Sequence, residues 1–143
     1  MRTLESTSEY FVGLDLGQKR DFTAFCIVER RVEMFDAKDP VTWDFVRRTR
    51  FHLRHLGRMP LGTPYPEVVE RVVKVVHSLS LRGKCEVVVD ATGVGGPVVD
   101  LLRAARLDCP VVAVTITGGE APVRVGAAWR VPKPLKRVTS SQY

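Results

Sequence analysis

The stretch Cys85-Glu-Val-Val-Val-Asp90 runs directly into Ala91-Thr-Gly-Val-Gly-Gly-Pro97. The first part is too apolar for a surface strand and is typical of a central parallel strand. The second part is a glycine-rich turn, and its proline suits the first position of a helix. A buried strand, a glycine turn and a helix in succession predict an α/β protein.

A second apolar run, Tyr10-Phe-Val-Gly-Leu-Asp15, also ends in an acidic residue. We expect residues 10–15 to form the first strand, buried on both faces. Open α/β sheets bind ligands at the carboxyl ends of their parallel strands, so Asp15 and Asp90 are the candidate functional residues. Aspartate also initiates turns, and each acid taken alone is open to that simpler interpretation.

The periodicity of apolar residues predicts the remaining elements. Residues 35–48 stay ambiguous between a short helix and an insertion. The expected elements are a strand at 22–34 in a hairpin with the first, a half-exposed strand at 50–54, a helix near 66–79, a second helix from Pro97, and a buried strand at 111–116.

These elements follow one another as β-β-β-α-β-α-β, the order of the ribonuclease H-like fold. We expect a mixed sheet with right-handed crossovers and helices on both faces. The sequence predicts a flexible N-terminus at 1–9, a core at 10–120 and a basic C-terminal segment at 121–143.

The formal net charge of +6 is concentrated at the C-terminal end. No acidic residue follows Glu120, which leaves 17 basic and 16 acidic residues, a net of +1, in the rest of the chain. A neutral core with a basic end suggests a polyanionic partner such as nucleic acid, although a disordered end without a partner is the alternative. The candidate DNA-binding residues are Arg124, Arg130, Lys133, Lys136 and Arg137.

Hydropathy and cysteine content point to a cytoplasmic protein. No apolar run approaches the roughly 18 residues of a membrane span, and the N-terminus lacks the apolar core of a secretory signal. Cys26, Cys85 and Cys109 are isolated and odd in number, which favours reduced thiols over disulfides or zinc ligands.

The expected sheet makes the first strand a parallel neighbour of the strand at 85–90. Adjacent strands lie about 4.8 Å apart, so both acids would reach one divalent cation. Mg²⁺, as two ions, would then support phosphodiester hydrolysis. Asp21 is either a third ligand or simply the end of its loop.

Three segments together resemble the nuclease domain of bacteriophage terminase large subunits. They are Val12-Gly-Leu-Asp-Leu-Gly-Gln-Lys-Arg-Asp-Phe-Thr-Ala24, Leu56-Gly-Arg-Met-Pro-Leu-Gly-Thr-Pro-Tyr-Pro66 and Val88-Val-Asp-Ala-Thr-Gly-Val-Gly-Gly-Pro-Val-Val-Asp-Leu-Leu102. The likeness covers roughly residues 10–135, including Val114-Thr-Ile-Thr-Gly-Gly119 and Val131-Pro-Lys133.

The resemblance implies an endonuclease that depends on Mg²⁺ or Mn²⁺ and cuts concatemeric double-stranded DNA during genome packaging. Asp15 matches the catalytic aspartate of the first strand, Asp90 the acid of the fourth, and Asp21 an acidic position in the first loop. The implied partners are double-stranded DNA, the terminase ATPase domain, the small terminase subunit and the portal, in the bacterial host cytoplasm.

The chain departs from the family pattern in two ways. It lacks the packaging ATPase, and it lacks a further acid on a C-terminal helix, which leaves the C-terminal part of the fold incomplete. It would then be a piece of an enzyme, a split gene product or a prophage remnant. The alternatives are a non-catalytic remnant that binds DNA or a packaging partner, and an actin- or sugar-kinase-like ATPase.

Overall fold

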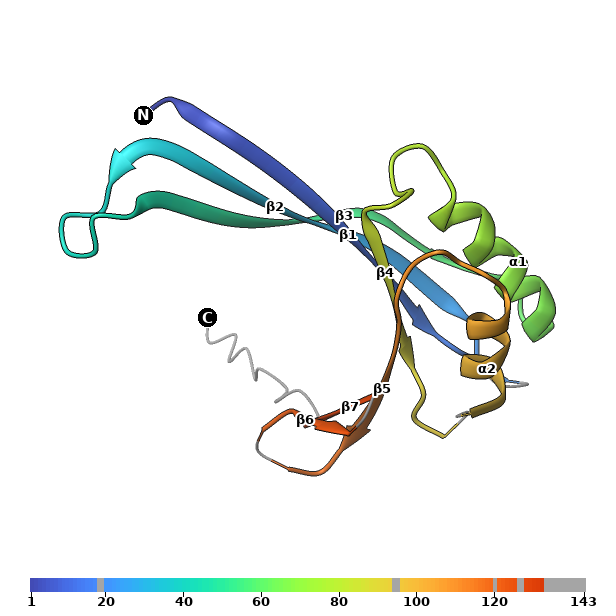
Figure 1. Ribbon diagram of the computed structural model, residues 1–143. Coiled ribbons are helices and arrows are strands. Elements are labelled where there is room, and N and C mark those ends of the chain that lie inside the picture. The colour runs from blue at the N-terminus through green and yellow to red at the C-terminus, as the bar shows by residue number, and fades with distance from the viewer. Residues whose placement is uncertain (18–19, 94–95, 120, 126–127, 133–143) are drawn as a thin grey trace, which may run out of the picture.

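The computed structural model has one seven-stranded mixed sheet and two helices, and it describes residues 1–17, 20–93, 96–119, 121–125 and 128–132 (Figure 1). The α/β class is therefore confirmed. The elements are β1 (Thr3–Asp15), β2 (Ala24–Lys38), β3 (Phe45–Arg58), α1 (Tyr65–Val76), β4 (Cys85–Asp90), α2 (Gly96–Ala104), β5 (Val111–Thr117), β6 (Val123–Val125) and β7 (Ala128–Pro132).

The strands lie in the order β3-β2-β1-β4-β5-β7-β6. β1 pairs antiparallel with β2, and β2 with β3, as the predicted hairpins require. β1 pairs parallel with β4, and β4 with β5. The predicted order of the first seven elements and the parallel pairing of the first and fourth strands are both confirmed.

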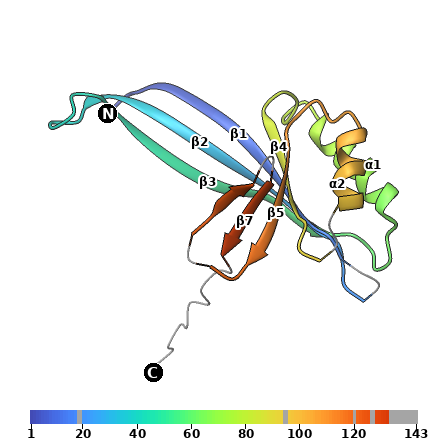
Figure 2. The same ribbon diagram turned by 60° about the horizontal axis from the view of Figure 1, so that its bottom comes forward.

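Both helices lie on one face of the sheet, so the prediction of helices on both faces is wrong for the described residues (Figures 1 and 2). α1 and α2 pack into the same hydrophobic cluster, whose strand residues include Val12, Leu14, Val87 and Val89. These positions alternate along β1 and β4, so they share one face. We call the other side of the sheet the open face.

The amphipathic pattern explains why α1 covers the sheet. Val68, Val69, Val72 and Val76 recur at helical spacing and are all buried. Pro66 lies in the first turn, where its missing N–H costs no hydrogen bond. Neither helix of the described part is long and apolar enough to cross a membrane.

The first three strands are longer than the sequence predicts. Their outer halves form a three-stranded arm that extends beyond the helices (Figure 1). Residues 3–9 belong to β1, so the prediction of a flexible segment at 1–9 is wrong there. Residues 35–48 form neither a helix nor an insertion, but the ends of β2 and β3 and the turn that joins them.

The basic C-terminal segment is partly built into the sheet. β7 pairs parallel with β5, and β6 pairs antiparallel with β7. The predicted boundary between a core at 10–120 and a separate segment at 121–143 is therefore wrong for these strands. Lys133, Lys136 and Arg137 lie outside the described residues.

Candidate functional site

Asp15 and Asp90 lie side by side at the ends of two paired strands. They are direct register partners in the parallel pair of β1 and β4. Parallel neighbours lie about 4.8 Å apart, so the two carboxylates share one small region of the sheet edge. The tertiary structure thus brings together two residues that are 75 positions apart in the sequence.

The alternation of side chains places both acids on the open face. Leu14 and Val89 precede them and are buried beneath the helices. Because successive residues of a strand point to opposite faces, Asp15 and Asp90 point away from the helices. The helices therefore leave both carboxylates uncovered.

Asp90 is held in place by the turn that follows it. Its Oδ1 accepts a hydrogen bond from the Thr92 N–H at 2.9 Å. The Thr92 hydroxyl oxygen in turn accepts one from the Ile116 N–H at 2.8 Å, which ties the turn to β5. Asp90 therefore has the turn-forming role considered from the sequence, and this role also fixes the position of its carboxylate.

Asp15 is exposed, and among the described residues its carboxylate has no hydrogen-bond or ion-pair partner. No ion pair with a described lysine or arginine neutralises this carboxylate. Carboxylate oxygens are the ligands that hard divalent cations prefer, and one or two carboxylates can hold Mg²⁺. The pair is therefore suited electrostatically to hold a divalent cation.

The acids border a hollow of about 370 Å³ on the open face. Its floor is mostly apolar, and its lining includes Gly13, Cys26, Leu56, Val88 and Ile116. A Cβ atom at Gly13 would lie 2.8 Å from the Cys26 sulfur, so glycine leaves room for the Cys26 side chain on this face. The carboxylates thus lie at the border of a largely apolar hollow.

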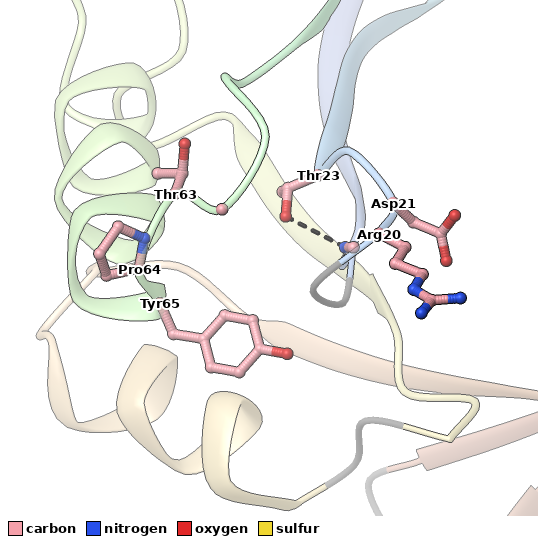
Figure 3. Close-up of a pocket in the computed structure, with 8 residues that line it drawn as sticks. Arg20, Asp21, Thr23, Thr63, Pro64 and Tyr65 are labelled. Atoms are coloured by element: carbon pink, nitrogen blue, oxygen red, sulfur yellow. Dashed lines mark hydrogen bonds between the residues drawn. The ribbon is translucent and has the colours of Figure 1, made fainter.

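Asp21 does not join the two acids. It lines a different hollow, of about 700 Å³, with Gly17, Thr23, the loop residues 62–64 and Tyr65 of α1 (Figure 3). Arg20 and Asp21 lie across this hollow from Thr63 and Tyr65 (Figure 3). Among the described residues no group of three or more His, Cys, Asp or Glu side chains could hold a metal ion.

The donor set of Asp15 and Asp90 fits one hard cation. Mg²⁺ binds through one or two carboxylates and keeps several water ligands. The described residues offer no third acid at this edge for a second ion. The prediction of two ions, with Asp21 as a ligand, thus has no support from the described geometry.

The candidate DNA-binding residues are only partly placed. Arg124 lies in β6 and interacts with another group. Arg130 lies in β7 opposite Val123 of β6 and Thr115 of β5. The other three candidates fall outside the described residues, so their role stays a prediction.

A buried ionic cluster around Glu29 was not anticipated from the sequence. Glu29 is fully buried and accepts hydrogen bonds from Ser8 at 2.6 Å, Arg31 at 3.0 Å and Arg54 at 2.6 Å. The bond from Ser8, followed by those from Arg54 and Arg31, lowers the pKa of Glu29 to about 2, against the opposing effect of burial. The signal in the sequence is the run Val28-Glu-Arg-Arg31, in which charged residues directly follow the apolar start of β2.

The comparisons with known proteins identify no relative. No family model matches the chain, and neither the curated proteins nor the solved structures contain a match.

Proposed function

We propose that this chain is a divalent-metal-dependent DNA endonuclease domain of the terminase type, with a ribonuclease H-like core. The observation that carries the proposal is the register pairing of Asp15 with Asp90 on the open face. The β-β-β-α-β-α-β order and the parallel contact between the first and fourth strands support the ribonuclease H-like assignment.

The proposed chemistry divides between the protein and the ion. Asp15 and Asp90 hold one Mg²⁺ or Mn²⁺, and the Thr92 N–H keeps Asp90 oriented. A bound ion would polarise a phosphodiester and lower the pKa of a coordinated water. Because only two carboxylates of the described part contribute, we expect weak metal affinity and slow cleavage.

The proposed substrate is double-stranded DNA. By the sequence resemblance, the proposed partners are a packaging ATPase domain, a small terminase subunit and a portal in the host cytoplasm. Phosphate contacts from basic residues would make DNA binding strongly dependent on salt.

The test is a plasmid-nicking assay with Mg²⁺ or Mn²⁺ at millimolar concentrations. We expect Asp15→Asn and Asp90→Asn each to abolish nicking, since each removes half of the negative charge that holds the ion. Asp100→Asn is the matched control, because Asp100 is exposed on α2 and its loss should leave nicking unchanged. Circular dichroism checks that each variant is folded.

Wild-type nicking by both site variants, or equal nicking in the presence of EDTA, would reject the proposal. Binding of DNA without any nicking would favour the alternative of a non-catalytic DNA-binding protein.

A further inference from the structure

β3 forms one edge of the sheet, at the opposite end from β6 and β7. It is 14 residues long and pairs with β2 at all of them except Val46 and Arg54, and no described strand lies on its other side. In an edge strand, alternate N–H and C=O groups point outward without a strand partner. Such an edge is a template for the addition of another strand.

The side of β3 that belongs to the open face is apolar and unusually exposed. Leu53 lies opposite Val28, and Leu56 lies opposite Cys26, a residue of the open-face hollow. Phe51, Leu53 and Leu56 are 66%, 61% and 69% exposed. Soluble proteins rarely leave contiguous patches of large apolar side chains in water, so such a patch along an edge strand indicates an interaction surface.

The opposite side of β3 is basic. Arg48, Arg50 and His52 lie opposite Glu33, Arg31 and Glu29 of β2. Arg54 and Arg31 share the single carboxylate of Glu29, and Arg50 lies 3.5 Å from Glu33. Arg48 instead lies over the ring of Phe35, a contact that leaves its charge in place. This side of β3 thus carries three arginines, Arg48, Arg50 and Arg54, and no acid, so it is positive. The other two arginines of the strand, Arg47 and Arg58, lie at the two ends of the apolar side.

This charge distribution argues against two other occupants. A second copy paired through β3 would place arginines next to arginines, and like charges across a strand pair are destabilising. A nucleic acid would contact the arginines but would leave the three apolar side chains in water. An extended polypeptide satisfies the backbone groups, the basic side and the apolar side together.

We propose that the β3 edge binds an extended segment of a partner protein in which acidic and apolar residues alternate. The partner adds a strand to the sheet, with its apolar side chains against Phe51, Leu53 and Leu56. Its acidic side chains face Arg48, Arg50 and Arg54. This proposal is independent of the proposed nuclease activity, because it uses neither Asp15 nor Asp90.

The test measures fluorescence anisotropy of labelled peptides of about eight residues, the length of an ordinary strand. One peptide alternates glutamate and valine, and a second has the same composition with the glutamates and valines in separate blocks. We expect the alternating peptide to bind at least about tenfold more tightly, which corresponds to about 1.4 kcal/mol. Binding should shift the backbone amide NMR signals of β3.

Leu53→Glu is the test variant and should weaken binding of the alternating peptide about tenfold or more, because it places a negative charge against the partner strand. Leu79→Glu is its control, since Leu79 is 95% exposed and lies outside β3. Both substitutions replace an exposed leucine, so both variants should fold.

Equal affinity for the two peptides would show attraction by charge alone and would overturn the proposal. Displacement of the peptide by a single-stranded oligonucleotide, with the same loss in Leu53→Glu, would assign the edge to nucleic acid. Dimerisation through β3 in sedimentation experiments would assign it to a second copy.

Discussion

At the scale of single residues, the orientation of a side chain decides whether an acid is functional or structural. Asp15 and Glu29 both lie in the first hairpin, but they point to opposite faces of the sheet. Asp15 faces the open side and is exposed, whereas Glu29 faces the helix side and is surrounded by donors. The first is therefore available to bind a cation, and the second already has its partners.

Glu29→Gln should lower the free energy of unfolding at neutral pH, because Arg31 and Arg54 would lose their shared negative charge. The pKa of Glu29 falls from 4.5 to about 2 on folding. A lowered pKa stabilises the fold above the unfolded value, and this contribution is lost as the pH falls from about 4.5 towards 2. Urea unfolding at a series of pH values should therefore show a difference between wild type and variant that shrinks in acid.

Glu70→Gln provides the control, since Glu70 is exposed on α1. It should match the wild type across the same pH series. An unchanged urea midpoint for Glu29→Gln at neutral pH would contradict the stabilising role assigned to the cluster.

At the scale of elements, packing on one face holds each helix to the sheet. α2 is only nine residues long, too short to be stable alone, so its attachment depends on the buried side chains Val98, Val99 and Leu102. The adjacent residue, Leu101, points away from the sheet and is 42% exposed.

Leu102→Ala should lower the free energy of unfolding by about 2–5 kcal/mol, the usual cost of a cavity at a fully buried leucine. Leu101→Ala removes the same atoms from an exposed site and should cost less than about 1 kcal/mol. Chemical denaturation of the two variants measures both values. Equal losses would show that α2 does not pack as described.

At the scale of the whole molecule, the sheet has a covered part and an uncovered part. β1 pairs with β4 only from Tyr10 to Asp15, where both strands lie beneath the helices. The outer half of β1 pairs with β2 alone and has no helix over it (Figure 1). The arm therefore has far less buried apolar surface per residue than the core.

Hydrogen exchange should follow this division, because local opening is easiest where few apolar contacts are lost. We expect the amides of Glu86–Val89 to exchange most slowly. The amides of β1 between Glu5 and Ser8 should exchange much faster, although they too are paired in a sheet. Exchange measured by NMR or mass spectrometry at neutral pH checks the order. Equal protection of the two regions would show that the arm is stabilised by contacts beyond those described.

The sequence alone determined the kinds of element and their order. The apolar runs at 10–15 and 85–90 and the valine spacing of α1 carry enough hydrophobic signal to be recognised locally. It also placed Asp15 and Asp90 at strand ends, because each interrupts an apolar run. The arm was missed because residues 3–9 are mostly polar and residues 47–49 entirely so. Their strand conformation depends on backbone pairing with neighbours distant in the sequence.

Only the tertiary structure decided which face each strand turns to the helices. That choice placed Asp15 beside Asp90 on the open face, separated both from Asp21, and buried Glu29 among its arginines. The physical reason is that hydrophobic periodicity is a property of one segment. The register of a strand and the side that it buries depend on pairs of segments. Backbone hydrogen bonds between strands set the register, and the helices that cover the sheet decide which side is buried.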